Sequence, residues 1–130
     1  MDHIHGKVIL YTLYLSDYPN LIIEKKLGKK YKPDVSSVDD EGRVLFWGES
    51  GVVSRKKQKE LLKKYPNTHF AFLKHSIDTS IYEKELTKLL GKIKRNAPVD
   101  LIGRPTDLSR FISENGEVSI TESDCRIIRF

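Results

Sequence analysis

Two acidic residues flank a predicted β-hairpin in the first half of the chain. Asp34 lies near the start of one β-like run, Pro33–Val38, and Glu49 ends the next, Arg43–Glu49. The segment between the runs, Asp39–Gly42, has acidic turn residues followed by glycine, which indicates a hairpin turn. The hairpin therefore brings the two carboxylates toward the same end of the pair of strands.

The register of this hairpin decides whether the carboxylates share a face. If Val38 lies opposite Arg43, Asp34 faces Trp47, and Glu49 lies two residues further along on the same side. Diagonal neighbours in an antiparallel pair lie within the span of one cation. The sequence therefore predicts a carboxylate pair, and a shift of one residue would separate it.

Such a pair suggests metal-dependent hydrolysis. Two adjacent carboxylates repel each other unless something neutralises them, and Mg²⁺ (or Mn²⁺) binds a few carboxylate oxygens while it keeps several waters. The cation can acidify a water and stabilise a phosphodiester under attack. Lys56 and Lys57 follow shortly after Glu49 and are candidates for a nearby ammonium, and Glu24 is a candidate third carboxylate.

The elements that position these residues follow one another with short turns. Strands are expected at Lys7–Leu15, Thr68–Lys74 and Val99–Ile102, beside the hairpin. One or two helical turns are expected at Leu21–Leu27, a helix capped by Ser54 at Ser54–Tyr65, and an amphipathic helix at Ser80–Arg95. A C-terminal meander is expected from Ser109–Glu114, Glu117–Thr121 and Cys125–Phe130, with Asn115-Gly116 in its first turn.

Composition bounds the class of protein. The 130 residues carry a net charge of +5 and are 38% hydrophobic, which fits a single basic domain, 1–130. The one cysteine, Cys125, excludes an intramolecular disulfide and a cysteine-rich zinc site. The sequence has no apolar run of membrane-spanning length and no signal-peptide pattern, so we expect a cytoplasmic protein without a membrane partner.

The positive charge is concentrated in two runs on either side of the hairpin, whereas Phe111–Cys125 holds four acids and no base. Two basic runs beside one acidic pair indicate surfaces that contact phosphates, so nucleic acid, either DNA or RNA, is the expected partner. The candidate contacts are Lys29, Lys30, Lys32, Arg55, Lys57 and Lys59.

The residues also carry a family resemblance. Glu24, then Pro33-Asp34, then Glu49-Ser50-Gly51 with a lysine shortly after, resembles the PD-(D/E)XK nuclease superfamily. The stretch Trp47–Lys56 is similar to the YaeQ-like branch, in which a strand ends in Trp-x-Glu-x-Gly and a basic helix follows. The C-terminal stretch Ile112–Ile120, with one more strand after it, looks similar as well.

The resemblance implies an α/β (α+β mixed) fold of the restriction-endonuclease type: a central mixed sheet flanked by helices, with a C-terminal meander. It implies that Asp34, Glu49 and the backbone carbonyl of Ser50 bind Mg²⁺, with Glu24 in support. The superfamily has a lysine where this chain has Gly51, and Lys56 lies where the YaeQ-like pattern has one.

Three functions follow from these expectations. The first is a Mg²⁺-dependent nuclease, which could act as a homodimer. The second is a catalytically inactive module of the same fold that binds nucleic acid or a protein, as the missing lysine suggests. The third is a structural protein that binds only protein partners.

Overall fold

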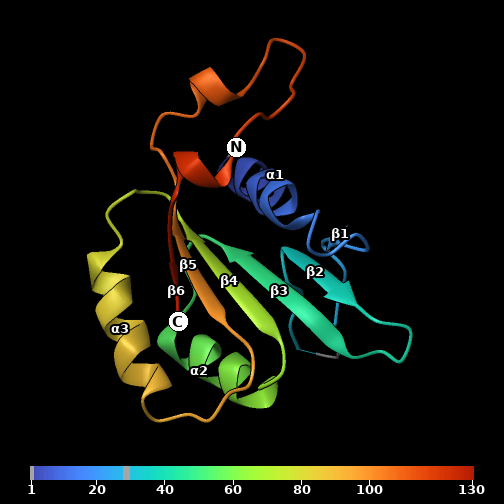
Figure 1. Ribbon diagram of the computed structural model, residues 1–130, viewed down its shortest axis with the longest axis vertical. Coiled ribbons are helices and arrows are strands. Elements are labelled where there is room, and N and C mark those ends of the chain that lie inside the picture. The colour runs from blue at the N-terminus through green and yellow to red at the C-terminus, as the bar shows by residue number, and fades with distance from the viewer. Residues whose placement is uncertain (1, 28–29) are drawn as a thin grey trace.

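A computed structural model describes residues 2–27 and 30–130, and it contains one mixed β-sheet with helices on both faces (Figure 1). The helices are α1 (Asp2–Tyr14), α2 (Arg55–Lys64) and α3 (Ser80–Leu90), with short 3-10 turns η1 (Ser109–Phe111) and η2 (Glu122–Asp124). The strands are β1 (Ile22–Ile23), β2 (Val35–Val38), β3 (Val44–Ser50), β4 (His69–Lys74), β5 (Val99–Gly103) and β6 (Arg126–Arg129).

The order of the strands across the sheet is the order of the strands along the chain. Strands β1, β2 and β3 pair antiparallel, β3, β4 and β5 pair parallel, and β6 closes the edge antiparallel to β5. Each parallel pair is joined by a helix, α2 or α3, because a parallel connection must return the chain to the same end of the sheet. The predicted class, a mixed α/β fold with helices that flank the sheet, is confirmed.

The two faces of the sheet bury separate apolar clusters. Alternate residues of the strands point to opposite faces, so Phe46 packs with α1 on one face and Trp47 packs with α2 and α3 on the other. Both side chains are fully buried. Glu49 has the parity of Trp47 and therefore lies on the face of α2 and α3.

The prediction of a strand at Lys7–Leu15 is wrong, because this segment belongs to α1. Ile9, Leu10, Leu13 and Tyr14 are buried against the sheet, a helical spacing. Apolar residues also occur on the outer side of the helix, which hides the period of 3.6 in the sequence. Packing on the sheet outweighs the β propensity of the segment.

The prediction of helical turns at Leu21–Leu27 is also wrong. This segment contains the edge strand β1, which pairs with β2. Of the three apolar residues expected to point inward, Leu21 is buried, but Ile22 and Ile23 are exposed. The segment then turns at Glu24, whose positive φ of 58° is incompatible with a right-handed helix.

Both helices that were expected around the Thr68–Lys74 strand are present. Helix α2 begins after Ser54, whose side chain accepts a hydrogen bond from the backbone N–H of Lys57 at 3.1 Å. Helix α3 is shorter than expected, because it ends at Leu90 and not at Arg95. The predicted strand at Val99–Ile102 is β5.

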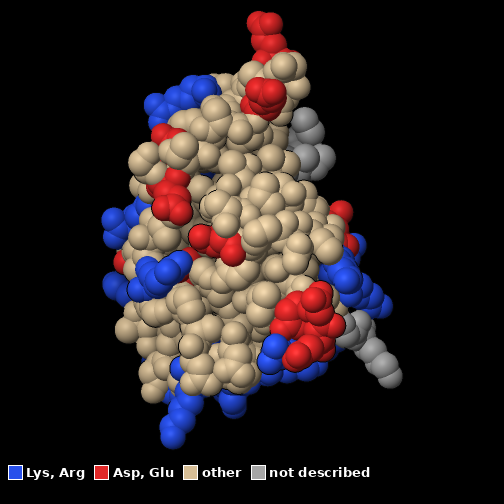
Figure 2. Space-filling model, turned by 45° about the vertical axis from the view of Figure 1, so that its right-hand side comes forward, with Lys and Arg blue, Asp and Glu red and all other residues tan. Residues whose placement is uncertain are grey.

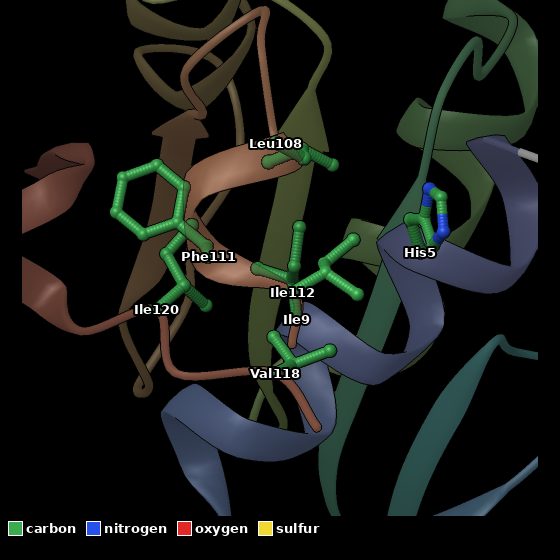
Figure 3. Close-up of a pocket in the computed structure, with 7 residues that line it drawn as sticks. All are labelled: His5, Ile9, Leu108, Phe111, Ile112, Val118 and Ile120. Carbon is green, nitrogen blue, oxygen red and sulfur yellow. The ribbon is translucent and has the colours of Figure 1, made fainter. Parts of the chain in front are cut away.

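The C-terminal meander is reduced to its turn and its last strand. Asn115-Gly116 does form a turn, but its flanks pair only at the bridge between Ile112 and Val118. Figure 3 shows why: Leu108, Phe111 and neighbouring apolar side chains of this segment gather against Ile9 of α1. The segment therefore covers α1 instead of extending a sheet.

A buried polar network joins α1 to the far edge of the sheet. Asp100, which is 1% exposed, accepts hydrogen bonds from Tyr14 at 2.7 Å and from Arg129 at 2.7 and 3.0 Å, and it contacts His69 Nε2 at 2.7 Å. Burial alone would raise the pKa of Asp100, but the bonds from His69, Arg129 and Tyr14 outweigh it and hold that pKa well below its usual range. The network fixes β4, β5 and β6 against α1.

No helix within residues 2–27 and 30–130 has both the length and the apolar character needed to cross a membrane.

Candidate active site at the end of strand β3

The hairpin of β2 and β3 brings Asp34, just before β2, next to Glu49, near the end of β3. Val35 lies opposite Gly48, and continuing this register by one residue sets Asp34 opposite Glu49. The sequence predicted Trp47 as the partner of Asp34, so the observed register differs by two residues. Val38 pairs with Val44 and not with Arg43, which shifts the register by one residue, and an irregularity between Ser37 and Val38 shifts it by one more. Because the shift is even, the two carboxylates keep a common face.

Backbone contacts position Asp34. Its Oδ2 accepts a hydrogen bond from the N–H of Ser50 at 2.7 Å, and its own N–H donates to the carbonyl of Gly48 at 3.1 Å. On its other side, the Asp34 carbonyl accepts from the N–H of Glu24 at 2.9 Å. These bonds use one carboxylate oxygen and tie the residue to the strands on both sides.

Glu49 is a buried carboxylate, only 6% exposed. Its Oε1 accepts a hydrogen bond from Trp47 Nε1 at 3.0 Å and lies 3.2 Å from Lys57 Nζ. Burial raises the pKa of Glu49, the contacts of Trp47 and Lys57 oppose that rise, and the negative charge of Asp34 adds to it. Glu49 therefore lies in a dry environment beside both an ammonium and a second carboxylate.

Lys57, and not Lys56, provides the ammonium beside Glu49. The Nζ atom of Lys57 forms the ion pair with Glu49 and also lies 5.3 Å from the centre of the Tyr31 ring. Lys56, the lysine chosen from the sequence, is one position nearer to the helix cap Ser54 and is exposed. Both lysines lie in the first turn of α2, and a difference of one residue turns the side chain by about 100° around the helix.

A second amine, Lys74, was missed in the sequence. Lys74 ends β4, is 6% exposed, and donates from Nζ to the carbonyl of Gly51 at 2.9 Å. Its Nζ lies 4.5 Å from the centre of the Tyr82 ring. Burial lowers the pKa of Lys74, and the negative charges of Glu85 and Glu49 oppose that effect.

A signal for Lys74 was present in the alternation of its strand. Phe70, Phe72 and Lys74 share one parity, and the two phenylalanines are buried under α2 and α3. The parallel register pairs Glu49 with Phe72. Lys74 is two residues beyond Phe72, so its side chain lies on the same face of the sheet as that of Glu49.

The chain turns sharply at Gly51, where φ is +91°. This conformation favours glycine, so a lysine at this position would be strained. The carbonyl of Gly51 accepts a hydrogen bond from the Lys74 amine, so the neighbouring strand β4 brings an amine to this turn.

The side chain of Glu24 points away from the carboxylate pair. It forms an ion pair with Lys7 of α1, on the opposite face of the sheet, and this contact lowers the pKa of Glu24. Ser50 contributes its N–H to Asp34, and its hydroxyl faces α1, where a Cβ on Gly6 would lie 1.9 Å from the Ser50 oxygen. A metal contact from the Ser50 carbonyl stays a prediction.

The predicted phosphate contacts have different surroundings. Lys30 pairs with Glu60 at 3.0 Å, Lys32 is exposed, and Lys29 lies outside the described residues. Arg55 pairs with Glu85 of α3 at 2.7 Å, and Lys59 lines a groove between α2 and α3.

The donor set fits a hard cation that keeps most of its water. In the described part of the chain no group of three or more His, Cys, Asp and Glu residues is arranged to hold a metal. Asp34 and Glu49 offer two carboxylates, and Mg²⁺ commonly binds through one or two carboxylates together with substrate phosphates and waters.

Among the comparisons with known proteins, the one with solved structures bears on the fold. No family model matches the chain, and no curated protein matches its sequence. The architecture is that of a mixed sheet whose polar site lies where β3 and β4 end. Among solved structures, this architecture is similar to that of YaeQ proteins.

The YaeQ protein from Pseudomonas syringae is similar over 98% of this chain and 75% of that chain, with a TM-score of 0.58 and 11% identity. The YaeQ protein from Xanthomonas axonopodis pv. citri is similar over 78% of this chain and 56% of that chain, with a TM-score of 0.54 and 16% identity. At these identities the likeness shows a shared fold, and the predicted closeness to YaeQ proteins is confirmed at that level.

Proposed function

We propose that this chain is a Mg²⁺- or Mn²⁺-dependent phosphodiesterase of the PD-(D/E)XK type that hydrolyses nucleic acid. The observation that carries the proposal is the meeting of Asp34 and Glu49 at the end of β3, with the amines of Lys57 and Lys74 beside them. Two carboxylates and two amines form a set that suits a cation and an anionic substrate together.

Asp34 and Glu49 would hold the cation, which would acidify a water and neutralise charge on the phosphate. The remaining work belongs to the chain itself. Ser50 orients Asp34 through its N–H, and Trp47 orients Glu49 through its ring N–H. The Lys74 amine is held by the carbonyl of Gly51 in a dry environment, where its protonated form would stabilise developing negative charge more strongly than it would in water.

The test is cleavage of single- and double-stranded DNA and RNA with Mg²⁺ or Mn²⁺. We expect cleavage by the unmodified chain and its loss in Asp34→Asn and Glu49→Gln. Asp40→Asn is the matched control, because Asp40 is an exposed acid in the turn of the same hairpin. Cleavage that survives Asp34→Asn would show that these carboxylates do not carry the activity.

A non-catalytic module of the same fold is the second candidate. It is favoured by Gly51 at the lysine position and by the engagement of Glu49 Oε1 with both Trp47 and Lys57. Calorimetric titration separates the two functions: binding of Mg²⁺ or Mn²⁺ that is lost in Asp34→Asn supports the enzyme, and the absence of binding at millimolar metal supports the module.

A further inference from the structure

A groove of about 390 Å³ runs between α2 and α3, outside the carboxylate pair. Five of its lining residues are cations and one is an acid: Arg55 and Lys59 from α2, and Lys84, Glu85, Lys88 and Lys92 from α3 and the turn after it. Gln58 and Leu89 complete the lining. The groove is therefore strongly positive.

The cations form two facing rows. Lys84, Lys88 and Lys92 follow one another at intervals of four residues, as do Arg55 and Lys59 across the groove. Residues four apart on a helix lie on the same side. The only acid in the lining, Glu85, is paired with Arg55 at 2.7 Å, so it leaves the other four cations uncompensated within the lining.

Such rows lower the stability of the helices, because like charges four residues apart on a helix repel each other. The rows do not contribute to the buried clusters, since Lys59, Lys84, Lys88 and Lys92 are exposed. By contrast, on the face seen in Figure 2 the Lys and Arg side chains lie mostly at the margins and not in facing rows. A surface that gathers positive charge on two sides of one groove is complementary to a chain of anions.

The groove adjoins the candidate active site. Arg55 begins α2, two residues before Lys57, which contacts Glu49. Across the groove, the charge of Glu85 acts on the amine of Lys74. The end of the groove at Arg55 and Glu85 is thus the end nearer to Lys57 and Lys74, and Lys92 lines the groove from the turn after α3.

We propose that the α2–α3 groove binds the backbone of single-stranded nucleic acid and leads it to the pair Asp34 and Glu49; the second half of this statement rests on the proposed function. Two rows of cations along a groove of about 390 Å³ suit one phosphate backbone that lies between them. Within each row, successive cations lie ~6 Å apart along the helix. A stacked single strand carries one phosphate per ~3.4 Å, and a stretched strand carries fewer phosphates per unit length.

The groove is tested by fluorescence anisotropy with a labelled oligothymidine of about 12 nucleotides, in EDTA so that no cleavage occurs. With about four phosphate contacts the logarithm of affinity falls with a slope of ~−3 against the logarithm of salt, so binding weakens roughly 60-fold between about 50 and 200 mM. The double variant Lys88→Glu/Lys92→Glu should bind at least about tenfold more weakly, with a slope flatter by ~1.4.

The matched control is Lys25→Glu/Lys26→Glu, which changes the net charge equally at exposed residues beside β1, at the other edge of the sheet. The proposal is overturned if the two double variants bind alike, if a duplex of the same length binds as tightly as the single strand, or if polyglutamate displaces the oligonucleotide at equal charge concentration. The last result would assign the groove to acidic proteins.

Cleavage of a small chromogenic phosphodiester separates this proposal from the proposed function. A groove variant that loses oligonucleotide binding but still cleaves the small ester with Mn²⁺ supports both. If the unmodified chain binds oligonucleotide but cleaves neither substrate, the proposed function fails and the groove stands.

Discussion

The substitution Asp100→Asn tests how strongly the buried polar network holds the sheet to α1. Four hydrogen bonds converge on this carboxylate, two of them from the guanidinium of Arg129, at 2.7 and 3.0 Å. Asparagine keeps one carbonyl oxygen and presents an N–H₂ group to the donors, so about two charge-assisted bonds are lost. Each such bond is worth roughly 1.5–3 kcal/mol. Because the Arg129 side chain is 60% exposed and its charge is partly screened, the low end applies, and the expected loss of unfolding free energy is about 3 kcal/mol.

The pH dependence has a definite sign. The folded-state pKa of Asp100 lies below its unfolded value of 3.8, so its stabilisation is complete well above 3.8 and is lost as the pH falls toward the folded-state pKa. The difference between the unmodified chain and Asp100→Asn should therefore be about 1 kcal/mol smaller near pH 3 than near pH 7.

The assay is urea unfolding followed by circular dichroism near both pH values. Asp107→Asn is the matched control, because Asp107 is an exposed acid that accepts from the N–H of Ser109, and asparagine caps equally well. If Asp100→Asn lowers the unfolding free energy by less than about 1 kcal/mol near pH 7, the inference that two charge-assisted hydrogen bonds are lost is refuted. A loss that is the same at both pH values would refute the role of the charge.

Further predictions concern the site and one close packing contact. Lys74→Met should lower the rate of nucleic-acid cleavage at least about 100-fold and raise the stability near neutral pH, because burial lowers the pKa of this amine; unchanged cleavage would contradict its role. Glu49→Gln should abolish Mg²⁺ binding in calorimetry without lowering the urea midpoint near neutral pH, because burial raises the pKa of this carboxyl; a large loss of stability would be inconsistent with that direction. Gly103→Ala should cost about 1–3 kcal/mol in thermal unfolding, since its Cβ would lie 2.6 Å from the carbonyl oxygen of Ser76, whereas Gly91→Ala, with 3.5 Å of clearance, should cost little.

The hairpin and the elements after it could be predicted because local signals agree with the tertiary structure there. Asp39–Gly42 forms the turn, with Gly42 at a φ of +83°, and the Asp39 side chain accepts from two backbone N–H groups of the turn. Ser54 caps α2. At such positions the same residues that specify the local conformation are compatible with the packing.

The N-terminal part could not be predicted, because the decisive interactions are distant in sequence. The segment Lys7–Leu15 is helical since Ile9 and Leu10 pack against the sheet, in the same cluster as Phe46 and Ile102. Its local β propensity favours the opposite conclusion. The exposed strand β1 is similarly determined by pairing with β2 and not by its own pattern.

The proximity of the two acids in the candidate site could be predicted from the sequence, and that of the amines only partly. Asp34 and Glu49 share a face because the register error was even, whereas the choice between Lys56 and Lys57 depends on the rotation of α2. Lys74 depends on the parallel pairing of β3 with β4, which no local signal specifies. Residues that come from one hairpin were therefore found more easily than those that join the hairpin to other elements.

The agreement between strand order and chain order has a consequence for how the molecule is made. During synthesis each new strand from β2 to β6 meets a neighbour that has already been produced, so the sheet can grow outward without waiting for a later segment. The contact of Arg129 with Asp100 comes last in this order, and it connects the last strand to the network that contains Tyr14 of the first helix. This contact can form only after nearly the whole described chain has emerged, so it is the final step that secures an assembly already complete around its candidate active site.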